Sequence, residues 1–407
     1  MRDVIIVGGG PGGLHTATAL ARQGFDVALY EEHVSTGEPV HCTGVLAEEA
    51  FEQFDLPRDV ILNTLSSASF VAPSGLTVEY TTPAIEAVVV DRRRLDLHLF
   101  ERSRAAGVTA VLDRRVVDLQ TDTDGVTVVC AGGWTERGRS LVLACGASYV
   151  LQRRLGLGLP QVFLQSAQME LPAGRPGGVE VRFGRNVAPL GFGWVVPVHR
   201  DAASLARVGV MCSHDARRHF ARLIREVSPR WAIDGAGPDG LPLRPRQKIL
   251  PLAPISRTFA DRLIAVGDAA GLVKATTGGG IYYSLVSGAL AAEVLGDALR
   301  KDRLAAESLR PYETAWRRRL GPELQAQLRL RRIAHRLTDP DINAFFELAV
   351  TDGVMPIVRR TASFNRHRDL IVSLLRHPPA RRVLLRRVAA RMAIERSTLT
   401  SAESSRN

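Results

Sequence analysis

The first 31 residues carry the pattern that most restricts how this chain can fold. An apolar segment (residues 4–7) leads into a glycine-rich turn (residues 8–13), an apolar stripe at helical spacing (residues 14–21) and a second segment with an apolar centre (residues 26–31). Strand, glycine turn, helix and strand in this order form a βαβ unit. The G-x-G-x-x-G spacing inside the turn is typical of dinucleotide-binding domains, so we predict such a domain at the start of the chain.

The residues of this turn have different physical roles. Gly8 permits the tight turn, Gly10 lets the backbone approach a pyrophosphate, and Gly13 lets the helix pack closely on the strand. Pro11 and Gly12 open the helix, whose N-terminal N–H groups and partial positive charge attract phosphate. We therefore assign all five residues to a cofactor site.

Glu31 ends the second apolar segment, 23 residues after Gly8. A carboxylate here binds a ribose hydroxyl pair and disfavours a 2′-phosphate, so the predicted nucleotide is FAD or NAD rather than NADP. A second match to the glycine pattern, at residues 235–240, is interpreted as a surface turn. No apolar strand precedes it, and Pro242 and Pro245 prevent a helix after it. One dinucleotide domain is expected.

The segment from Gly267 to Ile281 adds the features of a flavin site. Asp268 follows a predicted strand and is suited to bind the hydroxyl chain of a ribityl group. Three glycines then open a helix, whose free N–H groups would stabilise the negative charge that a reduced flavin carries near N1. The predicted cofactor contacts here are Gly267, Asp268, Gly278, Gly279, Gly280 and Ile281. With the first turn, they indicate FAD.

Two further residues are predicted to contact the cofactor. Arg92 enters a helix directly after a strand and can reach the pyrophosphate, although a solvated arginine at a helix start is the alternative. Val116 lies in the strand-rich segment that follows this helix.

The segment from Pro189 to Val198 predicts an aromatic strand. Phe192, Trp194 and Val196 alternate, so they share one face, and Pro197 is expected to end the run. Such a face is often only core, but it also suits the lining of a pocket for an apolar substrate.

Cys42 lies just beyond the strand that ends at Glu31, on the cofactor side of the predicted domain. An inert, buried thiol is the alternative, since free cysteines often pack as small apolar residues. The four cysteines are widely spaced and form no C-x-x-C pair, so neither a disulfide framework nor a metal site is expected.

The distribution of these segments predicts an α/β fold, α+β overall, with a discontinuous nucleotide domain. A Rossmann-like FAD-binding domain is interrupted by an inserted antiparallel-sheet substrate domain and is followed by a helical C-terminal region, with breaks expected at Pro311, Pro322, Pro340, Pro356 and Pro378-Pro379. The predicted ranges are 1–65, 90–160 and 251–300 for the FAD-binding domain, 66–89 and 161–250 for the sheet domain, 301–395 for the basic helical region and 396–407 for a disordered tail.

Taken together, these motifs resemble the geranylgeranyl reductase family, within the flavoproteins of the p-hydroxybenzoate hydroxylase fold. The segments HCTGV, VDRRRLD and GDAAGLVKATTGGGI resemble the family's cysteine, arginine and flavin-ring segments, with Ala275 where proline is more usual. The family pattern P-x-x-Y-x-W-x-F-P is matched, with Phe for Tyr and Val for Phe, by Pro189, Phe192, Trp194, Val196 and Pro197. The resemblance covers roughly residues 1–330.

The resemblance implies an FAD-dependent oxidoreductase that saturates C=C bonds in the isoprenoid chain of a lipid, quinone or (bacterio)chlorophyll-type substrate by flavin hydride transfer. It implies that Cys42 faces the flavin, and that Phe192 and Trp194 line a dry pocket and stabilise positive charge by cation–π attraction. These three are the predicted catalytic residues. Electrons are expected from NAD(P)H, docking transiently, or from a reduced ferredoxin-like protein.

Two alternatives stay open. One is a flavin-dependent monooxygenase or hydroxylase of the same fold. Related halogenases carry a catalytic lysine in the N-terminal half, whereas no lysine precedes Lys248, and the Asp-Gly pair of the hydroxylases is replaced by Cys145-Gly146. The other alternative is a non-catalytic, flavin-bearing, membrane-associated protein.

The positive charge of the chain is concentrated at its end. Residues 300–407 hold 23 Lys+Arg and 11 Asp+Glu, a net charge of +12, whereas residues 1–299 hold 30 and 31. Such a region attracts anionic lipid surfaces, although a solvated helical surface is the alternative. No apolar run approaches ~20 residues, so we expect no membrane-spanning segment. The widely spaced cysteines favour a reducing, cytoplasmic compartment. We also expect peripheral membrane association through this basic region and no nucleic-acid partner. The arginines predicted to contact lipid are Arg317 to Arg319, Arg331, Arg332, Arg381, Arg382, Arg386 and Arg387.

Overall fold

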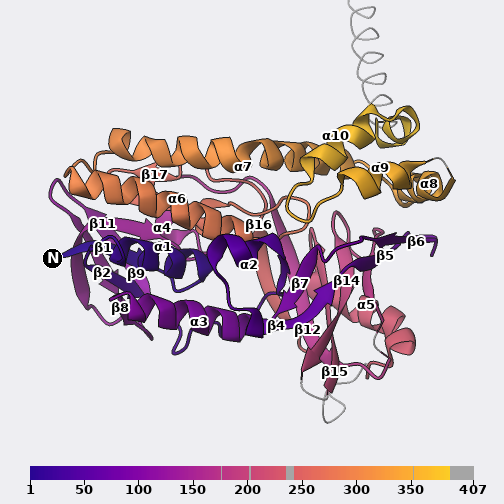
Figure 1. Ribbon diagram of the computed structural model, residues 1–407, viewed down its shortest axis with the longest axis horizontal. Coiled ribbons are helices and arrows are strands. Elements are labelled where there is room, and N and C mark those ends of the chain that lie inside the picture. Colours follow the sequence, from indigo (N-terminus) through magenta and orange to yellow (C-terminus); the bar gives the residue numbers. More distant parts are fainter. Residues whose placement is uncertain (176, 201–202, 235–242, 352, 386–407) are drawn as a thin grey trace, which may run out of the picture. The chain divides into compact units, whose positions relative to one another are not determined.

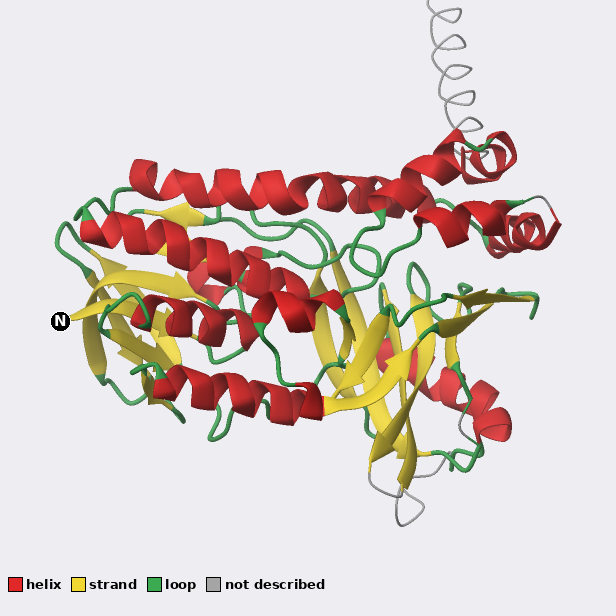
Figure 2. Ribbon diagram, in the orientation of Figure 1, coloured by secondary structure: helices red, strands yellow, loops and turns green. Residues whose placement is uncertain are grey.

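The computed structural model describes residues 1–175, 177–200, 203–234, 243–351 and 353–385 (Figures 1 and 2). Its internal contacts divide the chain into two compact units. Unit 1 consists of residues 1–64, 87–165 and 246–324, and unit 2 of residues 65–86, 166–245 and 325–407. This division describes packing and not ligand binding, so the predicted assignment of functional domains remains a prediction.

The central sheet of unit 1 is parallel and begins with the predicted βαβ unit. Its strands follow the order β18-β11-β1-β2-β8, and each neighbouring pair is parallel. Their bounds are Leu263–Ala265 (β18), Thr135–Leu143 (β11), Arg2–Val7 (β1), Val27–Tyr30 (β2) and Thr109–Val111 (β8). The antiparallel strands β9 (Val116–Thr121) and β10 (Val126–Cys130) extend from β11, and β17 (Phe259–Ala260) pairs with β18. The parallel core confirms the predicted α/β class.

Three helices of unit 1 pack together beside this sheet: α1 (Pro11–Ala21), α3 (Arg92–Ala105) and α6 (Ile281–Arg300) (Figure 1). Helix α1 contacts both others. It approaches α6 so closely that a Cβ at Gly288 would lie 2.8 Å from Thr16 Oγ1 and 2.9 Å from the Gly12 carbonyl oxygen. Gly12 therefore has a packing role besides the cofactor role predicted for it. Helix α6 begins directly after the three glycines that were predicted to open a helix.

The remaining elements of unit 1 are short. A three-stranded sheet has the order β3-β7-β4. The bounds are Val45–Ala47 (β3), Glu49–Phe54 (α2), Arg58–Val60 (η1), Ile61–Leu65 (β4), Ala87–Val90 (β7), Val150–Arg154 (α4), Arg246–Pro251 (β16) and Gly267–Ala270 (η3). All four cysteines of the chain are free thiols.

Helix α7 (Ala306–Ala334) corrects the prediction of breaks at Pro311 and Pro322, since it continues through both. Proline removes a helical hydrogen bond and its ring crowds the preceding turn. Burial of one face of the helix offsets that cost. The buried residues recur at helical spacing and are Leu309, Tyr312, Trp316, Leu320 and Leu324.

The sheet of unit 2 follows the order β12-β15-β14-β13-β5-β6. The bounds are Phe163–Pro172 (β12), Ala203–Cys212 (β15), Phe192–Arg200 (β14), Val179–Arg182 (β13), Ser67–Val71 (β5) and Thr77–Thr81 (β6). Helix α5 (Ala216–Trp231) packs on β15 and lies in a region that the sequence interpretation treats as strand-rich. Its apolar residues recur at helical spacing, which is the signal that was missed; those buried are Phe220, Leu223, Ile224, Val227 and Trp231.

Pro197 does not end the aromatic strand, contrary to the prediction. Strand β14 continues to Arg200, and Pro197 is opposite Ala206 of β15. On its other side, β14 pairs with β13 only as far as Val195. The missing N–H of Pro197 therefore falls where β14 has no partner from β13, which is where a strand tolerates proline.

Helices α8 (Asp339–Thr351), α9 (Val354–Thr361) and α10 (Arg368–Arg376) follow in unit 2. Pro340 and Pro356 lie in the first turns of α8 and α9, where a missing N–H costs little. The second glycine pattern at 235–240 and the predicted tail at 396–407 lie outside the described residues. Among the residues described, no helix is long and apolar enough to cross a membrane, and no group of three or more His, Cys, Asp or Glu side chains is placed to hold a metal ion.

Candidate functional site

The glycine turn between β1 and α1 has the geometry of a phosphate-binding turn. Gly8 has φ of +109°, and a Cβ there would lie 2.3 Å from the Ala144 carbonyl oxygen. A Cβ at Gly13 would lie 2.1 Å from the Gly8 carbonyl oxygen, so helix and strand touch at this point. A Cβ at Gly10 would meet no atom within 4 Å. The crest of the turn is therefore open, and Gly10 precedes the free N–H groups of α1.

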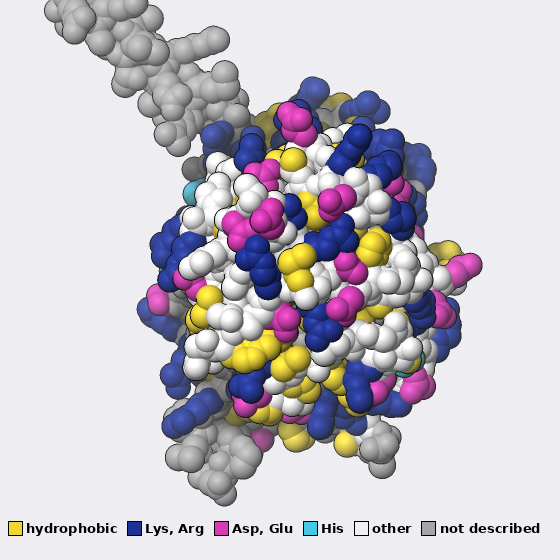
Figure 3. All heavy atoms as spheres, turned by 90° about the vertical axis from the view of Figure 1, so that its left-hand side faces the viewer, with side chains coloured by type: hydrophobic (Ala, Val, Ile, Leu, Met, Phe, Trp, Pro, Cys, Tyr) yellow, Lys and Arg dark blue, Asp and Glu magenta, His cyan; other side chains and the backbone are white. Residues whose placement is uncertain are grey.

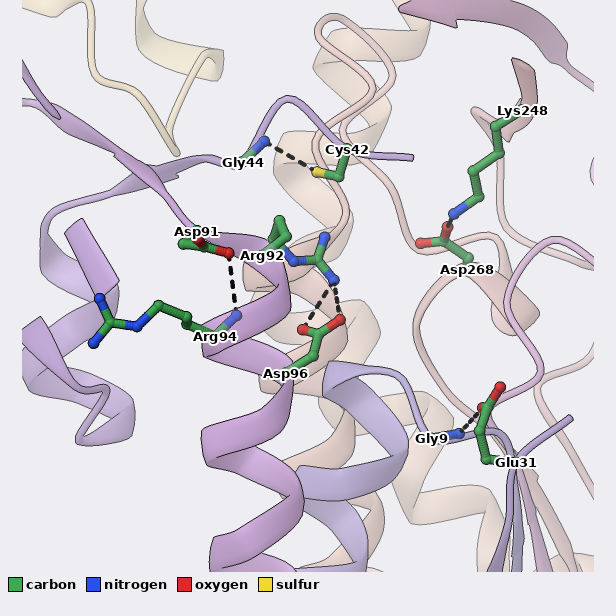
Figure 4. A network of polar contacts seen from close by, with 10 residues as sticks. All are labelled: Gly9, Glu31, Cys42, Gly44, Asp91, Arg92, Arg94, Asp96, Lys248 and Asp268. Atoms are coloured by element: carbon green, nitrogen blue, oxygen red, sulfur yellow. Dashed lines mark hydrogen bonds and ion pairs between the residues drawn. The ribbon is translucent and has the colours of Figure 1, made fainter. Parts of the chain in front are cut away.

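Glu31 is buried beside this turn. Its Oε2 accepts the N–H of Gly9 at 2.6 Å (Figure 4). Its Oε1 accepts the backbone N–H of His33 at 3.0 Å and lies 2.5 Å from His33 Nδ1. These contacts fix the carboxylate at the end of β2, where the sequence predicts a ribose-binding acid.

Cys42 lies next to the start of α3 (Figure 4). Its Sγ accepts the N–H of Gly44 at 3.3 Å, and the thiol acts electrostatically on the nearby Arg92 guanidinium. Arg92 in turn donates to both carboxylate oxygens of Asp96, at 3.0 and 2.8 Å. Burial opposes the charge of Arg92, but Asp96 and Cys42 outweigh it and raise the pKa of Arg92. Asp91 caps α3 by accepting the N–H of Arg94.

Asp268 lies in η3 and is held by several contacts within unit 1. Its carboxylate pairs with Lys248 Nζ at 3.2 Å (Figure 4). Its carbonyl accepts from the Tyr149 hydroxyl, and the next carbonyl, of Ala269, accepts from Gln152 Nε2 at 3.1 Å. A Cβ at Gly280 would lie 2.6 Å from Asp268 Oδ1, so the predicted ribityl-binding carboxylate and the predicted flavin-ring turn adjoin each other.

His41, next to Cys42, is surrounded by positive charge. Burial lowers the pKa of His41, and Lys248, Arg246 and His33 lower it further. Its Nδ1 is buried and has no hydrogen-bond partner within the described part of the chain. The charged form of His41 is therefore disfavoured.

Phe192 and Trp194 lie in unit 2, on a face of β14 that carries a row of aromatic rings. The Phe192 and Trp194 rings are 5.9 Å apart, and Phe183 lies 6.1 Å from Phe192 and 6.4 Å from Phe70. The Trp194 ring covers Gly209 of β15, where a Cβ would lie 2.3 Å from Trp194 Cζ2. Phe70 and Phe183 also pack against a small hydrophobic cluster of unit 2, so part of this aromatic face is core, and its role in holding an apolar ligand remains a prediction.

The residues present in unit 1 fit FAD. Gly10 leaves an open crest that a Cβ would fill, Glu31 is fixed beside it, and the Arg92 Nε is buried without a hydrogen-bond partner among the described residues. A donor in that state suits a polar ligand atom. Val116, at the start of β9, is half-buried against the core of unit 1, which neither supports nor excludes its predicted role.

Several functional candidates were not foreseen from the sequence. Asp96 stands four residues after Arg92, a spacing that brings two helical side chains together, so it was open to prediction. Lys248 and His33 meet their carboxylate partners only through the tertiary fold or through a loop conformation, for which the sequence carries no periodic signal.

Comparisons with known proteins agree with this geometry. The family described as pyridine nucleotide-disulphide oxidoreductase matches residues 2–169. The digeranylgeranylglycerophospholipid reductase of Methanocaldococcus jannaschii is 27% identical over 357 residues, which cover 85% of this chain and 90% of that protein.

Solved structures show the same fold. A geranylgeranyl bacteriochlorophyll reductase-like protein from Thermoplasma acidophilum superposes with a TM-score of 0.80 at 21% identity, covering 93% of this chain and 97% of that one. A mutant of the halogenase PltM in complex with FAD has a TM-score of 0.64 at 16% identity, covering 94% of this chain and 85% of that one. Over most of its length, the chain is thus similar to the geranylgeranyl reductase family of FAD-dependent oxidoreductases, as its motifs indicated.

Proposed function

We propose that this protein is an FAD-dependent reductase that saturates C=C bonds in the isoprenoid chain of a lipid, quinone or (bacterio)chlorophyll-type substrate. The observation that carries the proposal is the extent of the similarity. Dinucleotide domains occur in many oxidoreductases, but the match to a digeranylgeranylglycerophospholipid reductase covers 85% of this chain, far more than its dinucleotide-binding part.

In this proposal, unit 1 holds the cofactor through groups already described. The open turn at Gly10 and the N-terminus of α1 bind the pyrophosphate, and Glu31 binds the adenosine ribose. Asp268 binds the ribityl chain, and the turn at residues 278–281 offers N–H groups to the ring. Bound and reduced, FAD supplies a hydride to one carbon of the double bond.

The remaining steps fall to side chains of this protein. Phe192 and Trp194 hold the apolar chain, exclude water and stabilise positive charge on it by cation–π attraction. Cys42, which accepts the Gly44 N–H beside Arg92 (Figure 4), is proposed to shape the site and to deliver the proton that completes the addition to the second carbon. Phe192 has no hydroxyl to share that task. NAD(P)H or a reduced ferredoxin-like protein is proposed to restore the reduced cofactor.

A membrane contact is proposed for the C-terminal helices. Residues 353–385 contain seven arginines, all of them exposed, and only one acidic residue. By contrast, positive and negative side chains are interspersed on the face drawn in Figure 3. Arg331 is excluded from this contact, because it donates to the Leu190 carbonyl at 2.9 Å and burial lowers its pKa to about 10. Arg386 and Arg387 lie outside the described residues.

Co-sedimentation with vesicles tests the membrane contact. Binding is expected to require anionic lipid and to weaken with salt, because it is electrostatic. Changing Arg376, Arg381 and Arg382 to serine should reduce it, whereas Arg104→Ser in unit 1, as control, should not. Vesicle binding that depends neither on anionic lipid nor on salt concentration would refute the contact.

The enzymatic proposal is tested by anaerobic reoxidation of the flavin. The holoenzyme is reduced with dithionite and mixed with a geranylgeranyl lipid, and the flavin absorbance is expected to return. A flavin that reoxidises only with oxygen and an aromatic acid would indicate a hydroxylase of the same fold. A flavin that no substrate reoxidises would favour a non-catalytic protein.

A further inference from the structure

Lys274 is a buried amine inside the proposed flavin-ring segment, and none of the roles described so far uses it. Its exposed fraction is 2%, whereas Lys248 is half-buried and Lys301 is exposed. Its Cε and Cδ lie 3.6 and 3.7 Å from the position that a Cβ would take at Gly279. The backbone N–H of Lys274 donates to the Gly279 carbonyl at 3.1 Å, and the backbone carbonyl of Lys274 accepts from the Gly278 N–H at 2.8 Å. Both the backbone and the side chain of Lys274 therefore contact the turn that precedes α6.

Two carboxylates from other helices act on this amine. They are Glu49, at the start of α2, and Glu323, in α7. Helix α2 is also linked to α6 directly, because the Tyr282 hydroxyl donates to Gln53 Oε1 at 2.8 Å. Two neighbouring helices of unit 1 thus each bring a carboxylate that acts electrostatically on Lys274.

The charge of this amine is sensitive to pH. Burial disfavours the ammonium form and lowers the pKa of Lys274 to about 7, although Glu49 and Glu323 act to raise it. An ordinary lysine keeps its charge to about pH 10. Protonated Lys274 is attracted to the two carboxylates, and neutral Lys274 loses that attraction.

We propose that Lys274 is a positioning residue for the turn at residues 276–281, whose charge state sets how firmly the N–H groups of this turn are held. The inference rests on the proposed function, in which those N–H groups face the flavin ring. The protonated amine holds the turn toward α2 and α7. Loss of the proton loosens the turn and weakens its contacts with the cofactor.

Hydrogen–deuterium exchange tests the turn in the full-length protein without added cofactor. After correction for intrinsic rates, uptake by peptides covering 274–281 is expected to rise about fivefold between about pH 6 and about pH 8, as the amine loses its proton. Lys274→Met keeps the length without the charge, so fast uptake is expected at every pH. Lys274→Arg keeps the charge, so slow uptake is expected throughout.

Lys301→Met is the matched control, because Lys301 is exposed and pairs with Asp297 at 2.7 Å within α6. It should follow the wild-type profile. If Lys274→Met does not fold, Lys274→Gln replaces it. A wild-type profile without a pH-dependent step, or a step that persists in the uncharged variant, would overturn the inference.

Titration with FAD then separates this inference from the proposed function. The FAD dissociation constant of the wild type is expected to rise over the same pH range, and that of Lys274→Met to stay constant. A pH-dependent turn in a protein that does not bind FAD would contradict the proposed function and leave the role of Lys274 in the turn intact. FAD binding without the pH-dependent step would contradict the role of Lys274 in the turn and leave the proposed function intact.

Discussion

Arg92 and Asp96 form a doubly hydrogen-bonded ion pair within one turn of α3, beside the thiol of Cys42. The side chains of Arg92 and Asp96 are only 13% and 7% exposed. A buried pair of this kind adds little net stability, but removal of one partner leaves the other charge buried and uncompensated. The pair therefore fixes the position of Arg92 relative to Cys42 and to the proposed cofactor.

Replacement of Asp96 by asparagine is expected to lower the free energy of unfolding by about 3 kcal/mol, because the Arg92 charge stays buried with a neutral partner. Urea denaturation monitored by circular dichroism measures this. Asp59→Asn removes an exposed pair with Arg94 and should cost less than about 1 kcal/mol. Equal losses in the two variants would show that the Arg92–Asp96 pair is not desolvated.

The glycine turn offers a pair of variants that separates folding from cofactor binding. Gly10→Ala places its Cβ in open space at φ of −77°, so stability should not change, whereas FAD affinity should fall at least about tenfold. Gly13→Ala meets the Gly8 carbonyl and should lower the melting temperature. Calorimetry and FAD fluorescence titration measure the two effects. A Gly10→Ala variant that binds FAD normally would contradict the proposed position of the pyrophosphate.

Glu31→Gln is expected to weaken FAD binding about tenfold, because an amide accepts the Gly9 N–H and the ribose hydroxyls less strongly than a carboxylate does. Glu32→Gln is the matched control. Glu32 is the next residue, is exposed, and pairs with Arg115 on the surface. Equilibrium dialysis with FAD compares them, and similar affinities in both variants would remove Glu31 from the proposed site.

His15, in α1, should make stability depend on pH. Burial lowers the pKa of His15 to about 4, and Arg102 and Arg22 lower it further. The folded pKa lies below the unfolded value, so protonation favours the unfolded chain. This contribution to stability is fully present above about pH 6.5 and is lost as the pH falls through 4, up to about 3 kcal/mol.

His15→Gln should remove that part of the pH dependence, whereas His335→Gln, at an exposed position, should leave it unchanged. Denaturant unfolding at a series of pH values makes the comparison. An unaltered acid profile in His15→Gln would assign the dependence to other groups.

The sequence predicted those parts of the protein that local chemistry determines. The glycine turn, the start of α6 after three glycines and the start of α3 at Arg92 all follow from residues close together in the chain. The course of α7 through Pro311 and Pro322 did not, because burial of residues such as Tyr312 and Trp316 outweighs the local cost of proline. The continuation of β14 through Pro197 was not predicted either, because it depends on where β13 stops pairing with β14.

In the candidate site, too, the sequence predicted single residues but not the contacts that depend on tertiary packing. Gly10, Glu31 and Asp268 were named from spacing; the structure places them at the glycine turn, at the end of β2 and in η3, and their roles in cofactor binding remain predictions. The partners of those residues were not predicted. Lys248 reaches Asp268 from β16, and Cys42 acts electrostatically on Arg92, which is distant in the sequence, so both interactions depend on the tertiary fold.

Mass spectrometry of the lipid product tests the central claim most directly. The reduced holoenzyme is incubated anaerobically with a geranylgeranyl lipid, with the Cys42→Ser and Trp194→Ala variants in parallel. The account predicts a product that gains two hydrogen atoms for each double bond saturated, formed more slowly by both variants. A lipid that keeps its mass, with a fully reduced flavin present throughout, would contradict it.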